Sequence, residues 1–259
     1  MNQIIHGDSA VELKKLITES VDLTVTSPPY DNIRQYSGYS FDFETIAREL
    51  FRVTKNGGIV VWVVGDAVIK GSESGTSFKQ ALYFKEIGFN LHDTMIFHKS
   101  PHFPERINRY PQTFDYMFVF SKGKPKTFNP IMDHKNKPDS HKGGEVVRCG
   151  TLKNGEHTKK IRPKPREYSK RWNVWWFPIG YLSQTKDKVA YKHPAIFPER
   201  LAHDHIVSWS NEGDTILDCF AGSGTTLKMA KQLNRNYIGI DISEEYLEII
   251  RKRLAQDII

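Results

Sequence analysis

The sequence predicts an α/β protein built on a doubly wound, mostly parallel sheet. Short β-rich runs such as residues 21–25 and 236–241 alternate with stretches whose apolar residues recur at helical spacing. Residues 59–64 form an unbroken apolar run, which is typical of a central parallel strand covered on both faces. Residues 215–226 predict a strand, a glycine turn and the start of a helix. The length of 259 residues allows one large α/β domain with an insertion, or two small domains.

In chain order, the first half predicts strands separated by amphipathic helices. Ser9 and Glu12 form a capping-box pattern at the start of the first helix. Apolar positions from residue 43 to 51 predict a second helix, which should end at the Asn-Gly-Gly run 56–58. Phe78, Leu82 and the run 84–87 mark a third helix, which should stop at Gly88. The strands are expected at residues 3–6, 21–25, 59–64, 92–98 and 114–120, the last two as an antiparallel edge pair.

The last quarter of the chain predicts three helices and two strands. A helix should begin within residues 191–201 and run to about Asn211. Leu227, Ala230 and Leu233 give the next helix its buried face. Ser243 is the expected N-cap of the final helix, whose first turn carries two favourable glutamates. The strands are expected at residues 215–218 and 236–241.

The charge of the chain is concentrated in one segment. The formal net charge is +7, and residues 122–171 hold 15 Lys and Arg against five Asp and Glu, whereas the remainder holds 22 against 25. This segment has no clear periodicity, so it is either a solvated linker or an insertion that faces a polyanion. Trp172, Trp175, Trp176 and Phe177 follow it, and these aromatics either stack on bases or pack in the core.

Cysteine usage and the N-terminus bear on the compartment. Cys149 and Cys219 are far apart in unlike contexts, which favours a reduced cytosol and provides no zinc-binding spacing. The chain opens directly into a strand, and we expect neither a signal peptide nor a membrane span.

The first chemical motif is the run Thr-Ser-Pro-Pro-Tyr at residues 26–30, directly after a predicted strand. Its prolines have no N–H and a fixed φ, so they end strand pairing and hold the neighbouring groups rigidly. A hydroxyl and a carbonyl can accept both hydrogens of an exocyclic amine while the aromatic ring stacks on a flat base. A simple proline turn with a packed tyrosine is the alternative. The candidate catalytic residues are Ser27, Pro28, Pro29 and Tyr30.

The second motif is the glycine turn that follows residues 215–218. Its glycines allow close approach of a ligand, and the N-terminus of the helix after it offers backbone N–H groups. Asp241 ends a second strand about 20 positions beyond, where a carboxylate can hold ribose hydroxyls. The candidate cofactor residues are Asp218, Phe220, Ala221, Gly222, Ser223, Gly224, Thr225 and Asp241.

These two motifs together resemble the amino-group DNA methyltransferases that use S-adenosylmethionine. The Ser-Pro-Pro-Tyr run is similar to their catalytic tetrapeptide, and Phe-Ala-Gly-Ser-Gly-Thr at 220–225 is similar to their cofactor loop. The catalytic motif comes first, an order that resembles the circularly permuted β-class. The resemblance implies a Rossmann-like methyltransferase fold with a seven-stranded sheet, a catalytic part at residues 1–121, a basic target-recognition insertion at 122–190 and a cofactor-binding part at 191–259.

The resemblance also implies roles for residues outside the two motifs. Asp8 ends the first predicted strand at a position that approaches the cofactor's adenine in this family, although helix capping is an equally simple role. The run His-Pro-Ala-Ile-Phe-Pro at 193–198 is similar to the segment that lines the methionine end of the cofactor. The expected DNA contacts are Lys159, Lys160, Arg162, Arg106 and Arg109, although the loop that carries the last two can also be a plain surface connection.

The implied reaction is direct methyl transfer to a flipped-out base of double-stranded DNA, with no metal and no covalent enzyme intermediate. Ser27 stands where adenine-modifying relatives more often carry Asp, so the resemblance favours cytosine N4 over adenine N6. A nicotinamide oxidoreductase and a non-catalytic DNA-binding protein are the more distant alternatives. A cytoplasmic, nucleoid-associated location in a prokaryote or phage is implied. The sequence leaves open a homodimer and a separate cognate restriction endonuclease.

Overall fold

The structure is a computed structural model of the chain. It describes residues 2–29, 41–100, 108–136, 144–151, 157–162 and 166–256, with the backbone alone for 144–151 and 157–162. The chain divides into two compact units. The core unit comprises Met1–Asn129 and Asn173–Ile259, and the insertion unit comprises Pro130–Trp172. Among the described residues, no helix is long and apolar enough to cross a membrane.

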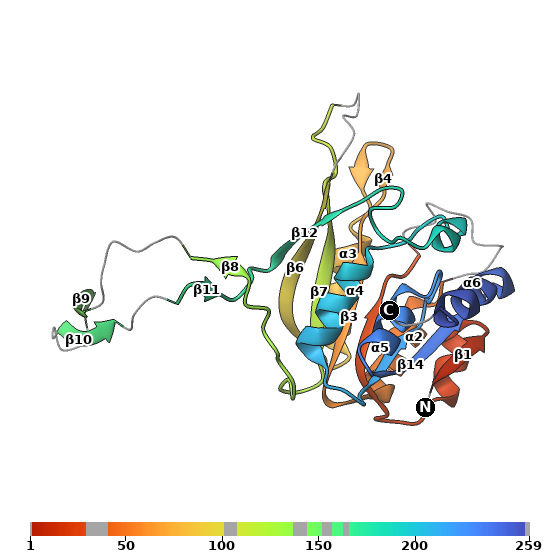
Figure 1. Ribbon diagram of the computed structural model, residues 1–259, viewed down its shortest axis with the longest axis horizontal. Helices are drawn as coiled ribbons and strands as arrows, with labels where there is room; N and C mark the ends of the chain where they lie inside the picture. The colour runs from red at the N-terminus through yellow and green to blue at the C-terminus, as the bar shows by residue number, and fades with distance from the viewer. Residues whose placement is uncertain are drawn as a thin grey trace. The chain divides into compact units, whose positions relative to one another are not determined.

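An eight-stranded sheet forms the centre of the core unit (Figure 1). Strand β7 runs antiparallel to both of its neighbours, whereas the other pairings in this sheet are parallel, so the sheet is mostly parallel, as expected. In spatial order its strands are β1 (Gln3–His6), β14 (Asn236–Asp241), β13 (Thr215–Asp218), β2 (Val21–Thr26), β3 (Thr54–Val64), β7 (Phe114–Ser121), β6 (Asn90–Ser100) and β12 (Val174–Pro178).

The sheet has one strand more than the seven expected. The additional strand is β12, which lies inside the segment 122–190 that we assigned to the insertion. It pairs in parallel with β6, with Trp175 and Phe177 buried while Trp176 remains exposed. Consequently β12 forms the edge of the sheet, and the antiparallel pair β6–β7 lies inside it. The insertion unit, Pro130–Trp172, is therefore narrower than the expected segment.

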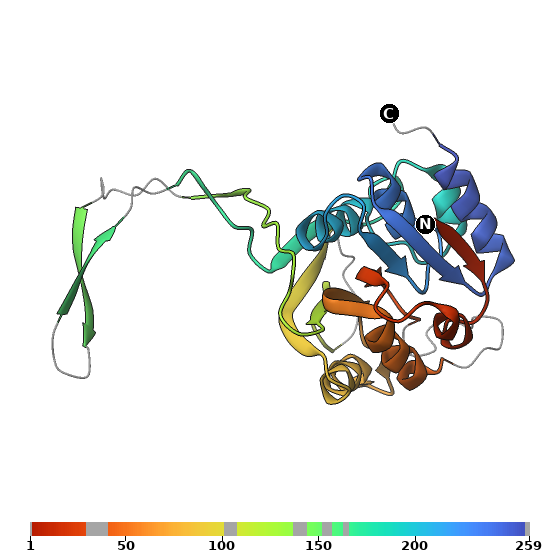
Figure 2. The same ribbon diagram turned by 90° about the horizontal axis from the view of Figure 1, so that it is seen from below.

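Helices cover both faces of the sheet, which makes it doubly wound (Figure 2). The first three helices share a hydrophobic cluster with β3, β7 and β14, whereas α5 and α6 share a second cluster with β1 and β14. The helices are α1 (Ser9–Glu12), α2 (Phe43–Val53), α3 (Thr76–Glu86), α4 (Glu199–Trp209), α5 (Thr225–Gln232) and α6 (Glu244–Leu254), with short 3₁₀ turns at Leu13–Lys15 and Lys188–Lys192.

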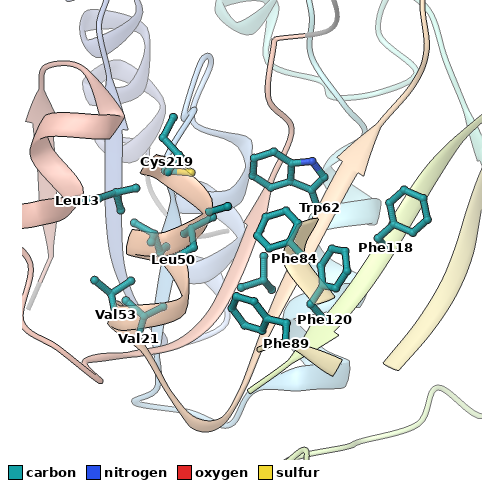
Figure 3. Packing of buried hydrophobic residues seen from close by; sticks show 14 of the residues in the cluster. Leu13, Val21, Leu50, Val53, Trp62, Phe84, Phe89, Phe118, Phe120 and Cys219 are labelled. Atoms are coloured by element: carbon teal, nitrogen blue, oxygen red, sulfur yellow. The ribbon is translucent and has the colours of Figure 1, made fainter. Parts of the chain in front are cut away.

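Aromatic side chains dominate the core on the α2–α3 face (Figure 3). Phe84 of α3 stacks on Phe120 of β7 with ring centroids 4.6 Å apart. Trp62 is fully buried, and its indole N–H donates to Gln80 Oε1 at 2.8 Å, so its polar atom is satisfied. Cys219 belongs to the same cluster, and burial raises the pKa of its thiol.

Two local expectations prove wrong at helix ends. Asp8, not Ser9, is the N-cap of α1, because its carboxylate accepts from the Ala10 N–H at 2.7 Å. Helix α2 ends at Val53, and the Asn-Gly-Gly run lies within β3, where Gly57 exchanges backbone hydrogen bonds with residues 122 and 126. The third helix is confirmed as α3, with Phe84 buried while Phe78 and Leu82 are exposed.

Two asparagines mark the points where the chain leaves and re-enters the core unit. The Asn129 N–H donates to the Ser208 carbonyl at 2.8 Å, and its side-chain amide contacts two further carbonyls at the end of α4. The Asn173 side chain donates to the Thr94 carbonyl at 3.2 Å, and its own carbonyl accepts from Ile96 N. Both anchors lie entirely within the core unit.

The insertion unit contains two short antiparallel pairs. Strands β8 (His134–Lys135) and β11 (Tyr168–Ser169) form one, and β9 (Gly144–Thr151) and β10 (His157–Arg162) form the other. Arg171 donates to both carboxylate oxygens of Asp133, at 3.1 and 3.0 Å from Nε, which ties the two ends of the unit together.

Candidate active site

The proline motif lies where β2 ends, in the middle of the sheet. Thr26 is the last residue of β2, and Ser27, Pro28 and Pro29 follow it as an extended segment with Pro28 buried. Strand β2 pairs in parallel with both β13 and β3, so its carboxyl end lies among those of its neighbours. In open α/β sheets this edge is where ligands bind. Tyr30 lies outside the described residues.

The glycine turn lies at the end of the adjacent strand. Strand β13 pairs with β2 through Ile216↔Leu23 and Leu217↔Thr24, so Asp218 lies beside the end of β2. The two motifs are therefore neighbours in space although about 190 residues separate them in the sequence. The two strands are neighbours in the middle of the sheet.

Two buried hydrogen bonds join the end of β2 to the segment that carries the glycine turn. Thr26 Oγ1 donates to Asp218 Oδ1 at 2.7 Å, and Thr226 Oγ1 of α5 donates to the Val25 carbonyl at 3.1 Å. Because Thr26 precedes Ser27 and Asp218 starts the glycine turn, these bonds fix the proline segment and the turn relative to each other. Buried bonds of this kind are costly to break, since each partner would be left unsatisfied.

Asp218 is a buried carboxyl with a perturbed pKa. Burial raises its pKa to about 6, although hydrogen bonds from Thr26, Thr226 and the Phe220 N–H act in the opposite direction. The nearby Asp241 carboxylate adds to the rise. Asp218 is therefore a structural link between the strands whose charged form is costly to bury.

The glycines of the turn adopt conformations that other residues rarely tolerate. Gly222 has φ +50° and Gly224 has φ +77°. A Cβ on Gly222 would lie 2.9 Å from His193 Nε2, and a Cβ on Gly224 would lie 2.9 Å from Ile250 Cγ1. Glycine is thus required at both positions by the backbone conformation. It is also required by close packing, against His193 at Gly222 and against Ile250 at Gly224.

Asp241 ends β14, the strand beside β13, and faces the glycine turn. Its Oδ2 accepts from the Gly222 N–H at 2.7 Å, and its Oδ1 accepts from the Ser243 N–H at 2.9 Å. Burial raises its pKa, while these backbone hydrogen bonds lower it. A carboxylate offers about four acceptor sites, so two backbone bonds leave capacity for hydroxyl donors.

Asp8 and the remaining turn residues lie along the same edge of the sheet. Asp8 follows β1, the strand on the far side of β14, and one of its oxygens caps α1. Ala221 is buried and donates its N–H to the Ile240 carbonyl at 2.9 Å, which joins the turn to β14. Phe220 packs edge-on against Trp62, 6.2 Å between ring centroids.

A fully buried arginine that sequence reasoning missed holds the glycine turn from behind. Arg253 lies in the last turn of α6, and its guanidinium has no exposed surface. Its NH1 donates to the Ser223 carbonyl at 2.7 Å and to the hydroxyls of Ser223 and Thr225 at 3.2 and 3.1 Å. The turn is therefore fixed by charge-assisted bonds from a helix far along the chain.

The same arginine belongs to a cluster of four charges whose other members, Asp187, Glu199 and Lys228, are partly buried. Its Nε donates to Asp187 Oδ2 at 3.0 Å and its NH2 donates to Glu199 Oε1 at 2.5 Å. Lys228 Nζ contacts the same two carboxylate oxygens at 2.7 and 2.9 Å. Asp187 and Glu199 bracket the segment that packs His193 against Gly222, so the cluster holds that segment onto the glycine turn.

Comparison with known proteins identifies the family. A family model described as DNA methylase matches residues 21–252, which is most of the chain. The chain belongs to this DNA methylase family. An orphan methyltransferase, M.BamHII of Bacillus amyloliquefaciens, is 57% identical to the methylase over 244 residues, covering 93% of this chain and 91% of the relative. DNA adenine methyltransferase YhdJ of Escherichia coli is 29% identical, covering 97% of this chain and 82% of the relative.

A solved structure of similar fold is the PvuII DNA methyltransferase, described as cytosine-N4-specific. Its TM-score is 0.70 at 21% identity, covering 100% of the methylase and 88% of that chain. This likeness confirms the Rossmann-like methyltransferase fold. Family membership removes the oxidoreductase and the non-catalytic DNA-binding alternatives.

The predicted DNA contacts that the structure describes lie in two places. Arg109 donates to the Gly71 carbonyl at 2.7 Å and pairs with Glu73 at 3.8 Å, so it contacts a hairpin of the core unit. Lys159, Lys160 and Arg162 lie on β10 of the insertion unit. Arg106 lies outside the described residues. Among the residues that are described, no group of three or more His, Cys, Asp or Glu is arranged to hold a metal ion.

Proposed function

We propose that this DNA methylase transfers a methyl group from S-adenosylmethionine to N4 of a flipped-out cytosine in double-stranded DNA, with adenine N6 as the alternative. The observation that supports the proposal most is the meeting of two strand ends. The amine-binding segment after β2 and the glycine turn after β13 are joined through Thr26 and Asp218 at 2.7 Å. A methyl donor and an amine acceptor held at these two ends would react by proximity.

The residues present fit the proposed cofactor. Asp241 has the acceptor capacity to bind a ribose diol, and the glycine turn lies within hydrogen-bond distance of its carboxylate. Helix α5 starts directly after the turn, so its N-terminal end and backbone N–H groups face the same region. When bound, S-adenosylmethionine supplies an electrophilic methyl group on a sulfonium. Two solved structures of similar fold, TTHA0409 from Thermus thermophilus and M1.HpyAVI, are described as complexes with it.

We infer that the proline segment prepares the amine for attack. The amine's lone pair is delocalised into the base, so the free base is a poor nucleophile. The Ser27 hydroxyl and the Pro28 carbonyl would each accept one amine hydrogen, which favours a pyramidal nitrogen with its lone pair available. Pro28 and Pro29 keep these acceptors in place, because their φ is fixed and Pro28 is buried. Tyr30 would stack on the base and offset part of its lost stacking.

The choice of cytosine depends on Ser27. A neutral hydroxyl can accept from either base, so the preference comes from the resemblance to the cytosine-N4 subgroup. The named comparisons do not decide between the bases, since YhdJ is named an adenine methyltransferase and the PvuII enzyme of similar fold is described as cytosine-N4-specific.

The insertion unit is proposed to contact the DNA. Strands β9 and β10 form an antiparallel ribbon in which Lys159 pairs with Val147 and Lys160 with Val146. The major groove of B-DNA admits a two-stranded ribbon, and a high local density of Lys and Arg suits the phosphate backbone. In this proposal Lys159, Lys160 and Arg162 supply the phosphate contacts.

The test identifies the methylated atom. The protein is incubated with duplex DNA and labelled S-adenosylmethionine. The DNA is then digested to nucleosides, and the labelled nucleoside is identified by chromatography and mass spectrometry. We expect N4-methylcytosine. N6-methyladenine would refute the base assignment, whereas 5-methylcytosine or no label in any DNA would refute the function.

Two variants at opposite ends of β2 sharpen the assignment. Ser27→Ala should lower kcat strongly, because one amine acceptor is lost. Ser20→Ala is the matched control, since Ser20 precedes β2 and its hydroxyl donates to the Ile17 carbonyl at 2.6 Å, away from the strand ends that carry the two motifs. Equal activity of the two variants would contradict the role of Ser27.

A further inference from the structure

A small hairpin follows β3 at the edge of the sheet where the proline segment lies. Strands β4 (Val68–Ile69) and β5 (Ser72–Glu73) pair antiparallel around Lys70 and Gly71, which have φ +49° and +81°. Two consecutive residues with positive φ are the mark of a type I′ turn, whose twist suits a two-residue hairpin. The β4 strand lies beyond the end of β3 (Figure 1).

The hairpin presents apolar side chains to solvent. Val68 is 50% exposed and Ile69 is 54% exposed. The first residue of the turn that follows them is Lys70. All six residues from 68 to 73 are exposed, so the apolar side chains of the hairpin are accessible to solvent. A single exposed valine would need no explanation, but two adjacent apolar residues and a lysine at a hairpin tip form a compact surface feature.

The hairpin is nevertheless held firmly where it joins the rest of the core unit. The Ser74 N–H donates to the Ala67 carbonyl at 2.9 Å, which joins the two residues that flank the hairpin. Asp66 accepts from the Ser77 N–H at 2.9 Å and from the Ser74 hydroxyl at 3.0 Å. Arg109 supports the far arm through the Gly71 carbonyl and Glu73. The exposed apolar residues are therefore presented in a fixed position, which lowers the entropy cost of binding.

The sheet register places the hairpin close to the proline segment. Thr26 pairs with Trp62, so Ser27 lies beside the last residues of β3. Val68 follows Trp62 by six residues, which span at most about 20 Å. Neighbouring strands are about 4.8 Å apart. The hairpin therefore lies near the same carboxyl ends of the strands as Ser27, within reach of a duplex bound there.

We propose that the β4–β5 hairpin enters duplex DNA beside the target base, with Val68 and Ile69 against base faces and Lys70 against phosphate. The inference rests on the proposed function, because it requires a duplex at Ser27. Extruding a base removes stacking on both sides of the gap, and apolar side chains inserted between base steps replace part of that contact. Arg109 then acts as a positioning residue of the hairpin.

The test compares paired and unpaired target bases. The double variant Val68→Ser/Ile69→Ser is assayed on a fully matched duplex and on the same duplex with the target base opposite a mismatch. We expect kcat/KM to fall roughly tenfold or more on the matched duplex and to recover on the mismatch, which is already partly unstacked. Affinity for S-adenosylmethionine should be unchanged.

Ile17→Ser is the matched control. Ile17 is 78% exposed but precedes β2, so it lies toward the amino end of that strand, away from Ser27. The inference is overturned if the hairpin variant loses equal activity on both duplexes, if it loses none, or if Ile17→Ser loses as much.

Lys70→Ala adds an independent readout. Removing one phosphate contact should lower the log–log salt slope of duplex binding by about 0.9. An unchanged slope would remove Lys70 from the interface. Absence of methylation of any DNA by the unaltered protein would instead refute the proposed function, so the two failures are distinguishable.

Discussion

Replacing Asp218 by Asn should change how the stability of the protein depends on pH. Asn keeps the shape of the side chain and an oxygen that can accept from Thr26 Oγ1 and the Phe220 N–H, but it cannot ionise. Burial raises the pKa of Asp218 to about 6 in the folded protein. The unfolded chain has the ordinary value of about 3.9. Each pKa unit corresponds to about 1.4 kcal/mol, so ionised Asp218 costs the folded state about 3 kcal/mol above pH 6.

The direction follows from proton binding. Between pH 4 and 6 the folded protein binds more protons at this site than the unfolded chain, so its stability falls as pH rises through this window. The asparagine of the variant is neutral throughout. The free energy of unfolding of the wild type, relative to Asp218→Asn, should therefore fall by about 2 kcal/mol between pH 4.5 and 7.5.

Urea unfolding followed by tryptophan fluorescence at several pH values measures this difference, and taking the difference cancels groups common to both proteins. Asp187→Asn provides a control of opposite sign. Burial would raise the pKa of Asp187, but hydrogen bonds from Lys228 and Arg253 hold it below its ordinary value. Its carboxylate therefore stabilises the folded protein above pH 4, and this contribution is lost as pH falls further. Parallel wild-type and Asp218→Asn profiles would refute the buried, raised-pKa description of Asp218.

Three further predictions concern the cofactor and the DNA. Asp241→Ala should weaken S-adenosylmethionine binding by about tenfold or more, and an unchanged Kd by calorimetry would contradict its role. Alanine at all three predicted contacts on β10 should flatten the salt dependence of DNA affinity, and an unaltered slope would make that ribbon a bystander. Arg253→Met should lower thermal stability and cofactor affinity together by leaving buried carboxylates poorly paired, whereas Arg251→Met, on the exposed face of the same helix, should change neither measurably.

Much of the fold was predictable because its signals are local. The apolar run of β3 and the glycine turn after β13 each lie within about a dozen residues of sequence. The adjacency of β2 and β13 was implied by the family resemblance and does not follow from the local pattern of residues alone. The structure then confirmed it through the pairing of Leu23 with Ile216.

What escaped prediction depends on partners far along the chain. In the sequence, Arg253 resembles an ordinary exposed basic residue in the last turn of a helix. It is buried because it pairs with Glu199 and Asp187, which lie 54 and 66 residues away in the sequence. Strand β12 was hidden for the same reason, since it becomes a strand by pairing with β6. At the start of α1, Asp8 and Ser9 are both good caps, and only the backbone geometry decides between them.

Because Asn129 and Asn173 are anchored in the core unit, the insertion unit between them can be exchanged as a whole. Their hydrogen bonds are made with the end of α4 and with β6, so they do not depend on what the chain encodes between them. Evolution can therefore rewrite residues 130–172 while the methyl-transfer machinery is inherited unchanged. A protein engineer can use the same two asparagines as splice points for grafting the corresponding segment of another family member.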